Sequence, residues 1–146
     1  MSDQSIFPTL GISASAMDAQ SYRMRVIAGN LANADTTKDV NGNVYRRRDV
    51  VFAEQLNRTL GGRRGPQNEA ANGVRIDRTV VDQSSLQRAY RPGHPDADPE
   101  GYVTLPNVNP MEEMVDMMVA TRAYEANVAA IKSAKTMALK ALEIGK

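Results

Sequence analysis

Both ends of this 146-residue chain carry apolar side chains at spacings that alternate between three and four residues, and this pattern limits the possible folds more than any other feature. At the N-terminus the seam consists of Leu10, Ser13, Met17, Gln20, Met24, Ile27, Leu31 and Ala34. At the C-terminus it consists of Met114, Met117, Thr121, Tyr124, Val128, Ile131, Lys135, Ala138 and Leu142. Because polar side chains interrupt each seam, neither helix is expected to be stable alone. The sequence therefore predicts two terminal helices that need partners.

The ends of these helices can be estimated from turn-forming residues. The first helix is expected to begin between Ser5 and Ser13 and to end near Asn33, where an Asp, Asn and Gly-rich stretch begins. The last helix is expected to follow Pro110. It has a second face of small side chains, which would let another helix approach closely: Ala120, Ala123, Asn127, Ala130, Ala134 and Ala141. The alternative is an ordinary antiparallel hairpin of core helices within a monomer.

The middle of the chain has the alternating pattern of short strands. A Gly, Arg, Asn and Gln-rich stretch, Leu60 to Gly73, predicts a mobile loop between them. Strands are expected at Tyr45 to Phe52, Val74 to Val81, Leu86 to Arg91 and Tyr102 to Leu105. The expected fold class is α+β, with terminal helices paired as a coiled-coil-like hairpin and a small antiparallel β element inserted between them.

This pattern divides the chain into two expected regions. Residues 1–35 and 110–146 would form a core domain of paired terminal helices. Residues 36–109 would form an outward-facing, β-rich middle region, with the mobile loop at 60–73.

Composition supports a chain that completes its folding against neighbours. Only about one residue in five is Leu, Ile, Val or Phe, near the level at which disorder becomes a concern, whereas the net charge of +1 argues against general disorder. There are no cysteines, so disulfides and thiolate sites are excluded. The sequence has no run of about 18 apolar residues, so no membrane span is predicted. Residues 1–5 lack the features of a cleavable signal peptide.

Candidate chemical sites are few. Asp96, Asp98 and Glu100 loosely resemble a calcium loop but lack its remaining ligands, and His94 is the only histidine. The methionines near residue 114 are better explained by adaptable packing than by metal ligation. The arginines at 46–48 do not form one patch, because alternate strand residues face opposite sides, so nucleic-acid binding is not expected. The sequence contains no nucleophile motif and no phosphate-binding loop. We therefore expect no enzymatic activity, no metal site and no cofactor.

Several blocks, in order along nearly the whole chain, carry a resemblance to a known family. The stretch Gly29 to Thr36 resembles the Asn-Leu-Ala-Asn signature that closes the N-terminal helix of bacterial flagellar rod and hook proteins. Four further stretches resemble the C-terminal block of the same proteins: Gly101 to Val103, Pro106 to Pro110, Glu112 to Val115 and Arg122 to Asn127. Tyr90 to Pro95 is similar to the proximal rod subtype in particular.

The resemblance implies a non-enzymatic axial subunit of the flagellar basal body, exported through the flagellar type III apparatus and assembled in the periplasm. The terminal helices would form the inner core of the rod and transmit motor torque. Expected partners are other copies of the chain, other rod subunits, the membrane ring, proteins near the export gate, and the periplasmic ring or cell wall. Asn30 and Asn33 would fix the helix exit, and the expected assembly positions are Met17, Met24, Ile27, Leu31, Met114, Met117, Tyr124, Val128, Ile131 and Leu142.

Two alternatives remain open. The chain can be another axial subunit of the same family, such as a distal rod or hook protein. In a different class, it can be a soluble helical scaffold whose basic loop binds an acidic partner.

Overall fold

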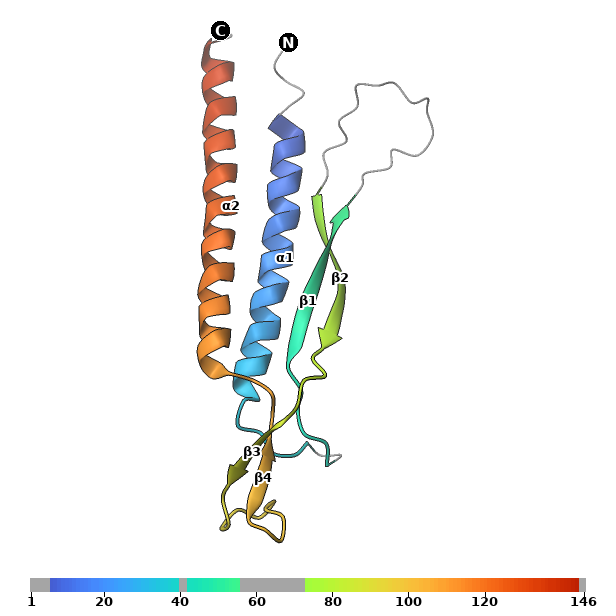
Figure 1. Ribbon diagram of the computed structural model, residues 1–146. Helices are drawn as coiled ribbons and strands as arrows, with labels where there is room; N and C mark the ends of the chain where they lie inside the picture. Colours follow the sequence, from blue (N-terminus) through green and yellow to red (C-terminus); the bar gives the residue numbers. More distant parts are fainter. Residues whose placement is uncertain (1–5, 40–41, 56–72, 145–146) are drawn as a thin grey trace, which may run out of the picture. The chain divides into compact units, whose positions relative to one another are not determined.

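A computed structural model describes residues 6–39, 42–55 and 73–144 (Figure 1). It has two long helices, α1 (Ile6–Ala32) and α2 (Pro110–Ile144), with four strands between them in the sequence. The strands are β1 (Arg48–Gln55), β2 (Gly73–Val81), β3 (Gln87–Tyr90) and β4 (Tyr102–Leu105). The expected α+β fold class is confirmed. The predicted mobile loop lies outside the described residues, except for Gly73, which opens β2.

The strands form two sheets of two strands each, β1 with β2 and β3 with β4. In Figure 1 the arrows of β1 and β2 point in opposite directions. β3 and β4 are antiparallel, with Gln87 opposite Leu105 and Tyr90 opposite Tyr102. Between the sheets, Ser84 donates its backbone N–H to Asp82 Oδ1 at 2.8 Å, a local turn that ends the first sheet.

The first strand begins three residues later than predicted, because side chains bind the backbone N–H groups at its first residue and just before it. The N–H of Arg47 is donated to Asn107 Oδ1 at 2.8 Å, and the N–H of Arg48 to Asn30 Oδ1 at 3.0 Å. The alternation of residue types could not reveal these partners, which are distant in sequence.

Side chains also define the C-terminal end of α1 and the N-terminal end of α2. At the end of α1, Asn33 donates Nδ2 to the Gly29 carbonyl at 2.8 Å, and the same carbonyl accepts the Asn33 backbone N–H at 3.2 Å. At the start of α2, Asn109 caps the helix by accepting the Met111 N–H at 3.1 Å, and Pro110 occupies the first position, where no N–H is needed. Glu112 and Glu113 then lie in the positive first turn.

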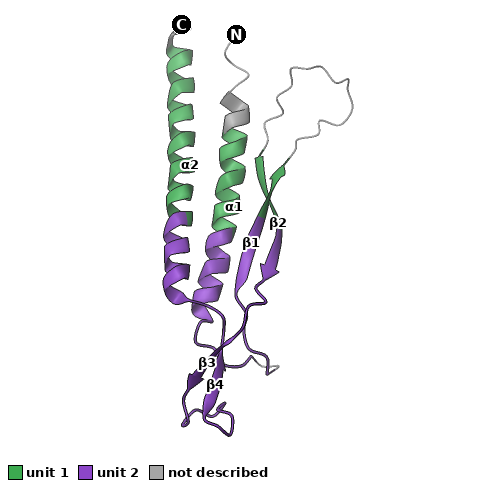
Figure 2. Ribbon diagram, in the orientation of Figure 1, with its two compact units in different colours: residues 1–22, 52–77, 120–146 green, residues 23–51, 78–119 purple. Residues whose placement is uncertain are grey.

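The chain divides into two compact units, shown in Figure 2. Unit 1 comprises Met1–Tyr22, Phe52–Asp77 and Ala120–Lys146, and unit 2 comprises Arg23–Val51 and Arg78–Val119. The buried hydrophobic side chains described in unit 1 are Ala19, Ala120 and Ala134, whereas those in unit 2 are Ile27, Val50, Val103 and Val108. Unit 1 therefore has a core of small side chains, which suits helices that approach closely.

Gly101 is required by the turn that joins β3 to β4. Its φ is +84°, and a Cβ there would lie 2.9 Å from Tyr90 Cε2 and 3.2 Å from Pro92 Cβ. Gly101→Ala is expected to lower the free energy of unfolding of unit 2 by about 1–2 kcal/mol for the backbone conformation alone. Thermal unfolding followed by circular dichroism measures this. Gly93→Ala is the control, because a Cβ at Gly93 meets nothing within 4 Å. Equal melting temperatures for the two variants would contradict the requirement.

Candidate assembly surface

Helix α2 exposes a continuous apolar stripe in unit 2. Met111, Met114, Val115, Met118 and Val119 are spaced so that they lie on one helix face, and they are 42–67% exposed. We call these five residues the α2 stripe. Exposed apolar patches of this kind are typical of surfaces that bind other proteins.

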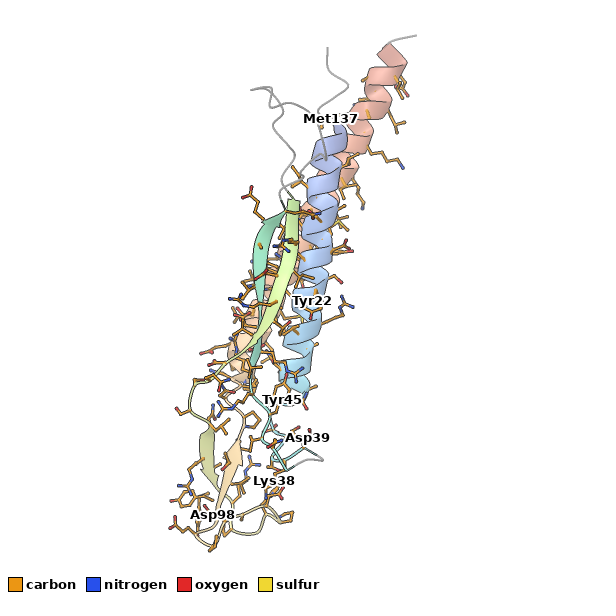
Figure 3. All side chains as sticks on the ribbon, turned by 90° about the vertical axis from the view of Figure 1, so that its right-hand side faces the viewer. Tyr22, Lys38, Asp39, Tyr45, Asp98 and Met137 are labelled. Carbon is orange, nitrogen blue, oxygen red and sulfur yellow. The ribbon has the colours of Figure 1, made fainter. Side chains whose placement is uncertain are left out.

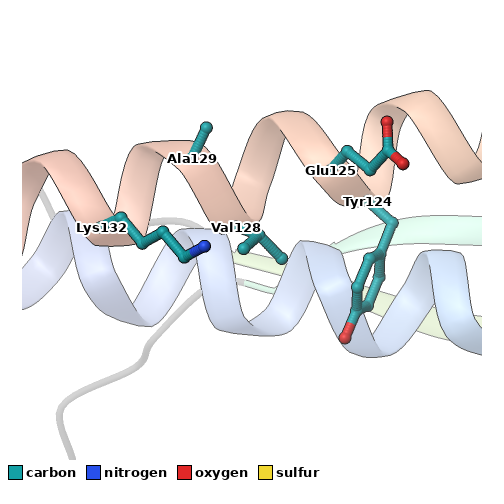
Figure 4. Close-up of a pocket in the computed structure, with 5 residues that line it drawn as sticks. All are labelled: Tyr124, Glu125, Val128, Ala129 and Lys132. Carbon is teal, nitrogen blue, oxygen red and sulfur yellow. The ribbon is translucent and has the colours of Figure 1, made fainter.

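The part of α2 in unit 1 has a shallow groove and further exposed hydrophobic residues. Tyr124, Glu125, Val128, Ala129 and Lys132 line the groove, a cavity of about 420 Å³ whose walls are mostly apolar (Figure 4). Beyond it, Met137 is 61% exposed and Leu142 is 71% exposed. Within the described residues, large apolar side chains are therefore exposed along both parts of α2.

The residues predicted for assembly fall into three classes of exposure. Ile27 and Asn30 are buried, at 5% and 1% exposed. Leu31, Met114 and Leu142 are exposed. The remaining ones are half-buried, namely Met17, Met24, Asn33, Met117, Tyr124, Val128 and Ile131.

Unit 2 also contains a buried polar cluster that the sequence did not predict. Glu113 is 0% exposed, and its two carboxylate oxygens accept hydrogen bonds from different parts of the chain. Arg47 Nε donates to Oε1 at 2.6 Å, and Asn30 Nδ2 donates to Oε2 at 3.0 Å. The contact with Asn30 joins the end of α1 to the first turn of α2. We call Asn30, Tyr45, Arg47, Asn107 and Glu113 the polar centre; Figure 3 labels Tyr45.

Asn30 acts in this cluster as a substitute for a strand neighbour. Its Nδ2 donates to the Arg48 carbonyl at 2.8 Å, and its Oδ1 accepts the Arg48 N–H at 3.0 Å. Both backbone groups of the first residue of β1 are thus paired by one side-chain amide. Oδ1 also accepts the Tyr45 hydroxyl at 2.9 Å. A buried side chain that satisfies this many groups explains why this position needs an amide.

Asn107 connects the polar centre to the turn after β2. Its Oδ1 accepts the Arg47 N–H, and its Nδ2 donates to Ser84 Oγ at 2.8 Å. The N–H of Asp82 is in turn donated to the Arg47 carbonyl at 2.8 Å. The backbone at Arg47 is therefore held on both sides.

The electrostatics of the polar centre follow from this geometry. Burial by itself would lower the pKa of Arg47, but the hydrogen bond to Glu113 and the negative charges of Glu113, Asp49 and Asp116 outweigh it, so that its pKa is raised. Burial raises the pKa of Tyr45, with the Arg48 charge opposing and the Glu113 charge adding to the shift. Both side chains therefore keep their protons near neutral pH.

The three consecutive arginines have separate partners within the protein. Arg46 donates to the carbonyls of Asp82 and Ser84, at 3.4 and 3.0 Å. Arg47 binds Glu113 and Asp116, and the Arg48 guanidinium lies 5.5 Å from the Tyr45 ring centroid. The sequence had indicated that they do not form one patch. It gave no sign that Arg47 binds a buried glutamate, since residues 47 and 113 are distant in the chain and Glu113 reads as a first-turn acid.

Among the described residues, no group of three or more His, Cys, Asp or Glu side chains is placed to hold a metal ion. In the same part of the chain, no helix has the length and hydropathy needed to cross a membrane.

Comparison with known proteins identifies the family. Residues 10–38 match the model described as flagella basal body rod protein, and residues 100–144 match that described as flagellar basal body rod FlgEFG protein C-terminal. The chain is 46% identical to the flagellar basal-body rod protein FlgC of Bacillus subtilis, with 96% of this chain and 98% of the relative covered. It is 40% identical to FlgC of Borreliella burgdorferi, over 95% and 97% of the two chains. It is 42% identical to FlgC of Escherichia coli O6:H1, over 92% and 93%.

The matched regions contain Asn30, Asn33 and Glu113, together with all of α2 and α1 from residue 10 onward. The resemblance inferred from short motifs is thus confirmed over nearly the full length. The chain belongs to the bacterial flagellar basal-body rod protein family and is a structural subunit of the rod, which places it in the basal body among other rod subunits.

Proposed function

We propose that this protein is a subunit of the proximal rod and that it polymerises through its terminal helices into a shaft that transmits motor torque. The exposed apolar surface of α2 carries this proposal. Among the side chains of that helix that the structure describes, eight large hydrophobic ones are exposed, from Met111 to Leu142. Burial of such surface stabilises association by about 25 cal/mol per Å² before the costs of association are subtracted.

The exposure of each expected assembly residue decides the role that we propose for it. Leu31, Met114 and Leu142 are exposed in the single chain and would be covered by neighbouring subunits. Met17, Met24, Met117, Tyr124, Val128 and Ile131 are half-buried, and their remaining surface would be covered in the same way. Ile27 and Asn30 are already buried, so we assign them to the fold of each subunit.

The contacts would be heterologous, since different faces of one chain meet on neighbouring subunits. Such contacts repeat as an open helix unless the rotation closes. Residues 1–35 and 110–146 would form the core of the rod, and residues 36–109 would face outward. Torque would then pass through many parallel helix interfaces.

The proposed partners extend from other rod subunits to the membrane ring, proteins near the export gate, and the surrounding periplasmic ring or cell wall. We place the protein in the periplasmic part of the basal body and assign it no enzymatic activity. The similarity to FlgC proteins over more than nine-tenths of the chain supports the proximal subtype.

Electron microscopy of cell envelopes from an in-frame deletion strain tests the proposal. Basal bodies are expected to stop at the membrane ring and to regain rods when a plasmid supplies the wild-type gene. Rods truncated at a more distal point would instead indicate another axial subunit of the family. Complete flagella in the deletion strain would contradict the proposal.

A further inference from the structure

Strands β3 and β4 in unit 2 present two tyrosines on an exposed surface. Tyr90 is 65% exposed and Tyr102 is 39% exposed. The two lie opposite each other in the strand register, with ring centroids 5.3 Å apart in an edge-to-face arrangement. We call this pair the tyrosine platform.

Neighbouring residues contact the platform and the backbone beneath it. The Arg88 guanidinium lies 5.0 Å from the Tyr102 ring centroid and is fixed by an ion pair with Asp98 at 2.6 Å. Asp98 Oδ1 accepts the N–H groups of Glu100 and Tyr102, at 3.0 and 2.8 Å. The hydrogen bond from the Tyr102 N–H, followed by the hydrogen bond and charge of Arg88 and then the Glu100 N–H, holds the pKa of Asp98 below its usual value, so Asp98 stays charged at neutral pH.

An exposed aromatic pair next to arginine is the composition found at the centres of protein interfaces. Because the two rings already contact each other and Arg88 contacts one of them, part of the side-chain entropy cost of binding is met within the chain. Arg91, directly after β3, is exposed and adds a second positive charge.

The α2 stripe in the same unit has matching chemistry. Three of its five residues are methionines, whose thioethers make favourable contacts with aromatic rings. The charged residues of α2 from Pro110 to Thr121 are all acidic, whereas those of β3 and Arg91 are basic. Beside the platform, Asp98 is paired with Arg88 and Glu100 is exposed, so Arg91 is the positive charge available to a partner. Glu113 and Asp116 are bound to Arg47, whereas Glu112 is exposed next to the stripe; Asp116 is exposed as well, but Arg47 is its partner.

We propose that the tyrosine platform of one copy binds the α2 stripe of a second copy, with Arg91 facing Glu112. This inference rests on the proposed assembly into a rod and adds a contact from the β region to the helix–helix contacts. The two surfaces differ, so each copy can bind one neighbour through its platform and another through its stripe, which gives an open chain of subunits.

Photo-crosslinking in basal bodies tests the contact. A copy with p-benzoylphenylalanine in place of Tyr90 keeps an aromatic ring at that position and is supplied to the deletion strain. We expect a crosslinked homodimer whose linked peptide, identified by mass spectrometry, contains Met111 to Val119 of the second copy. The same probe in place of Ser85, which is exposed in the same unit, is the control and should give no such peptide.

Charge reversal tests the pairing of Arg91 with Glu112. An exposed ion pair contributes up to about 1 kcal/mol, which corresponds to roughly fivefold in association, so Arg91→Glu should lower the crosslink yield by about that factor. Glu112→Arg on the same chain should restore most of it.

The outcomes separate this inference from the proposed function. Basal bodies that contain rods but give a crosslink to another protein, to another segment of the chain, or to none would overturn the platform contact and leave the rod assignment intact. Complete rods in the deletion strain without this protein would overturn both.

Discussion

Glu113→Ala is expected to destabilise unit 2 by about 2–3 kcal/mol. Removal of one partner of a buried ion pair typically costs about 3–5 kcal/mol, because the other charge is left uncompensated. The expected cost is smaller here for two reasons. The Arg47 side chain is 24% exposed, and it keeps its ion pair with Asp116 at 3.3 Å. Urea unfolding of the purified protein, followed by circular dichroism, measures the change. It is a large fraction of the stability of an ordinary domain.

The adjacent residue provides a matched control. Glu112 also lies in the first turn of α2 and interacts with the same helix dipole, but it is exposed. Glu112→Ala should therefore change the free energy of unfolding by less than about 1 kcal/mol. If both variants unfold at the same urea concentration, the polar centre does not stabilise unit 2.

A double-mutant cycle separates the ion pair from the rest of the polar centre. Arg47→Ala with Glu113→Ala should cost less than the sum of the two single changes, since the second removal leaves no unpaired charge. Asn30→Ala should cost about as much as Glu113→Ala, because Asn30 pairs the backbone of Arg48 as well as Glu113. Asn33→Ala removes a helix-end contact to Gly29 and a long hydrogen bond from Thr36, and should cost about 1 kcal/mol.

The regular elements could be predicted because their signals are local. Periodicity located both helices, and the limits of β4, Tyr102–Leu105, agree with the sequence prediction. Pro110 and the acidic pair after it indicated the start of α2. Capping, turn formation and amphipathic spacing depend on residues a few positions apart, so a single sequence contains them.

The polar centre could not be predicted because it depends on pairs distant in sequence. Asn30 and Glu113 are 83 positions apart, and Arg47 and Glu113 are 66 apart. The Asn-Leu-Ala-Asn motif did mark Asn30, and a role at the helix exit was expected for it. Its pairing with the start of β1 depends on where the chain returns after residue 39, which no local pattern specifies.

The heptad seam did not indicate which side chains are buried within the single chain. Ile27 is buried, but Met114 and Leu142 on the C-terminal seam are 42% and 71% exposed, while Ala120 and Ala134 on the small-residue face are 1% and 9% exposed. Periodicity shows which residues share a helix face. It does not show whether that face is covered by the same chain or by a neighbour, and in a subunit of a polymer both occur.

Ile131→Asp is expected to abolish motility while leaving export of the protein largely intact. Ile131 is half-buried on α2, three positions after Val128, which lines the groove. Within an assembled rod, a carboxylate at this position would be buried without a partner, at a cost of several kcal/mol. That cost would recur at every subunit of the polymer. Soft-agar swimming, together with immunoblots of the periplasmic fraction, measures motility and export separately.

The neighbouring Ser133→Asp controls for a new charge on this helix, since Ser133 is exposed, and cells carrying it should swim. Circular dichroism of purified Ile131→Asp checks that the helices still form, and Ile131→Met, which keeps an apolar side chain of similar volume, should support swimming. Motile cells that carry only Ile131→Asp would show that this face of α2 is not covered in the rod. Loss of motility in Ile131→Asp alone, with normal export and helix content, would place the assembly contact on this face of α2, because the substitution then affects only a state in which Ile131 meets a neighbour.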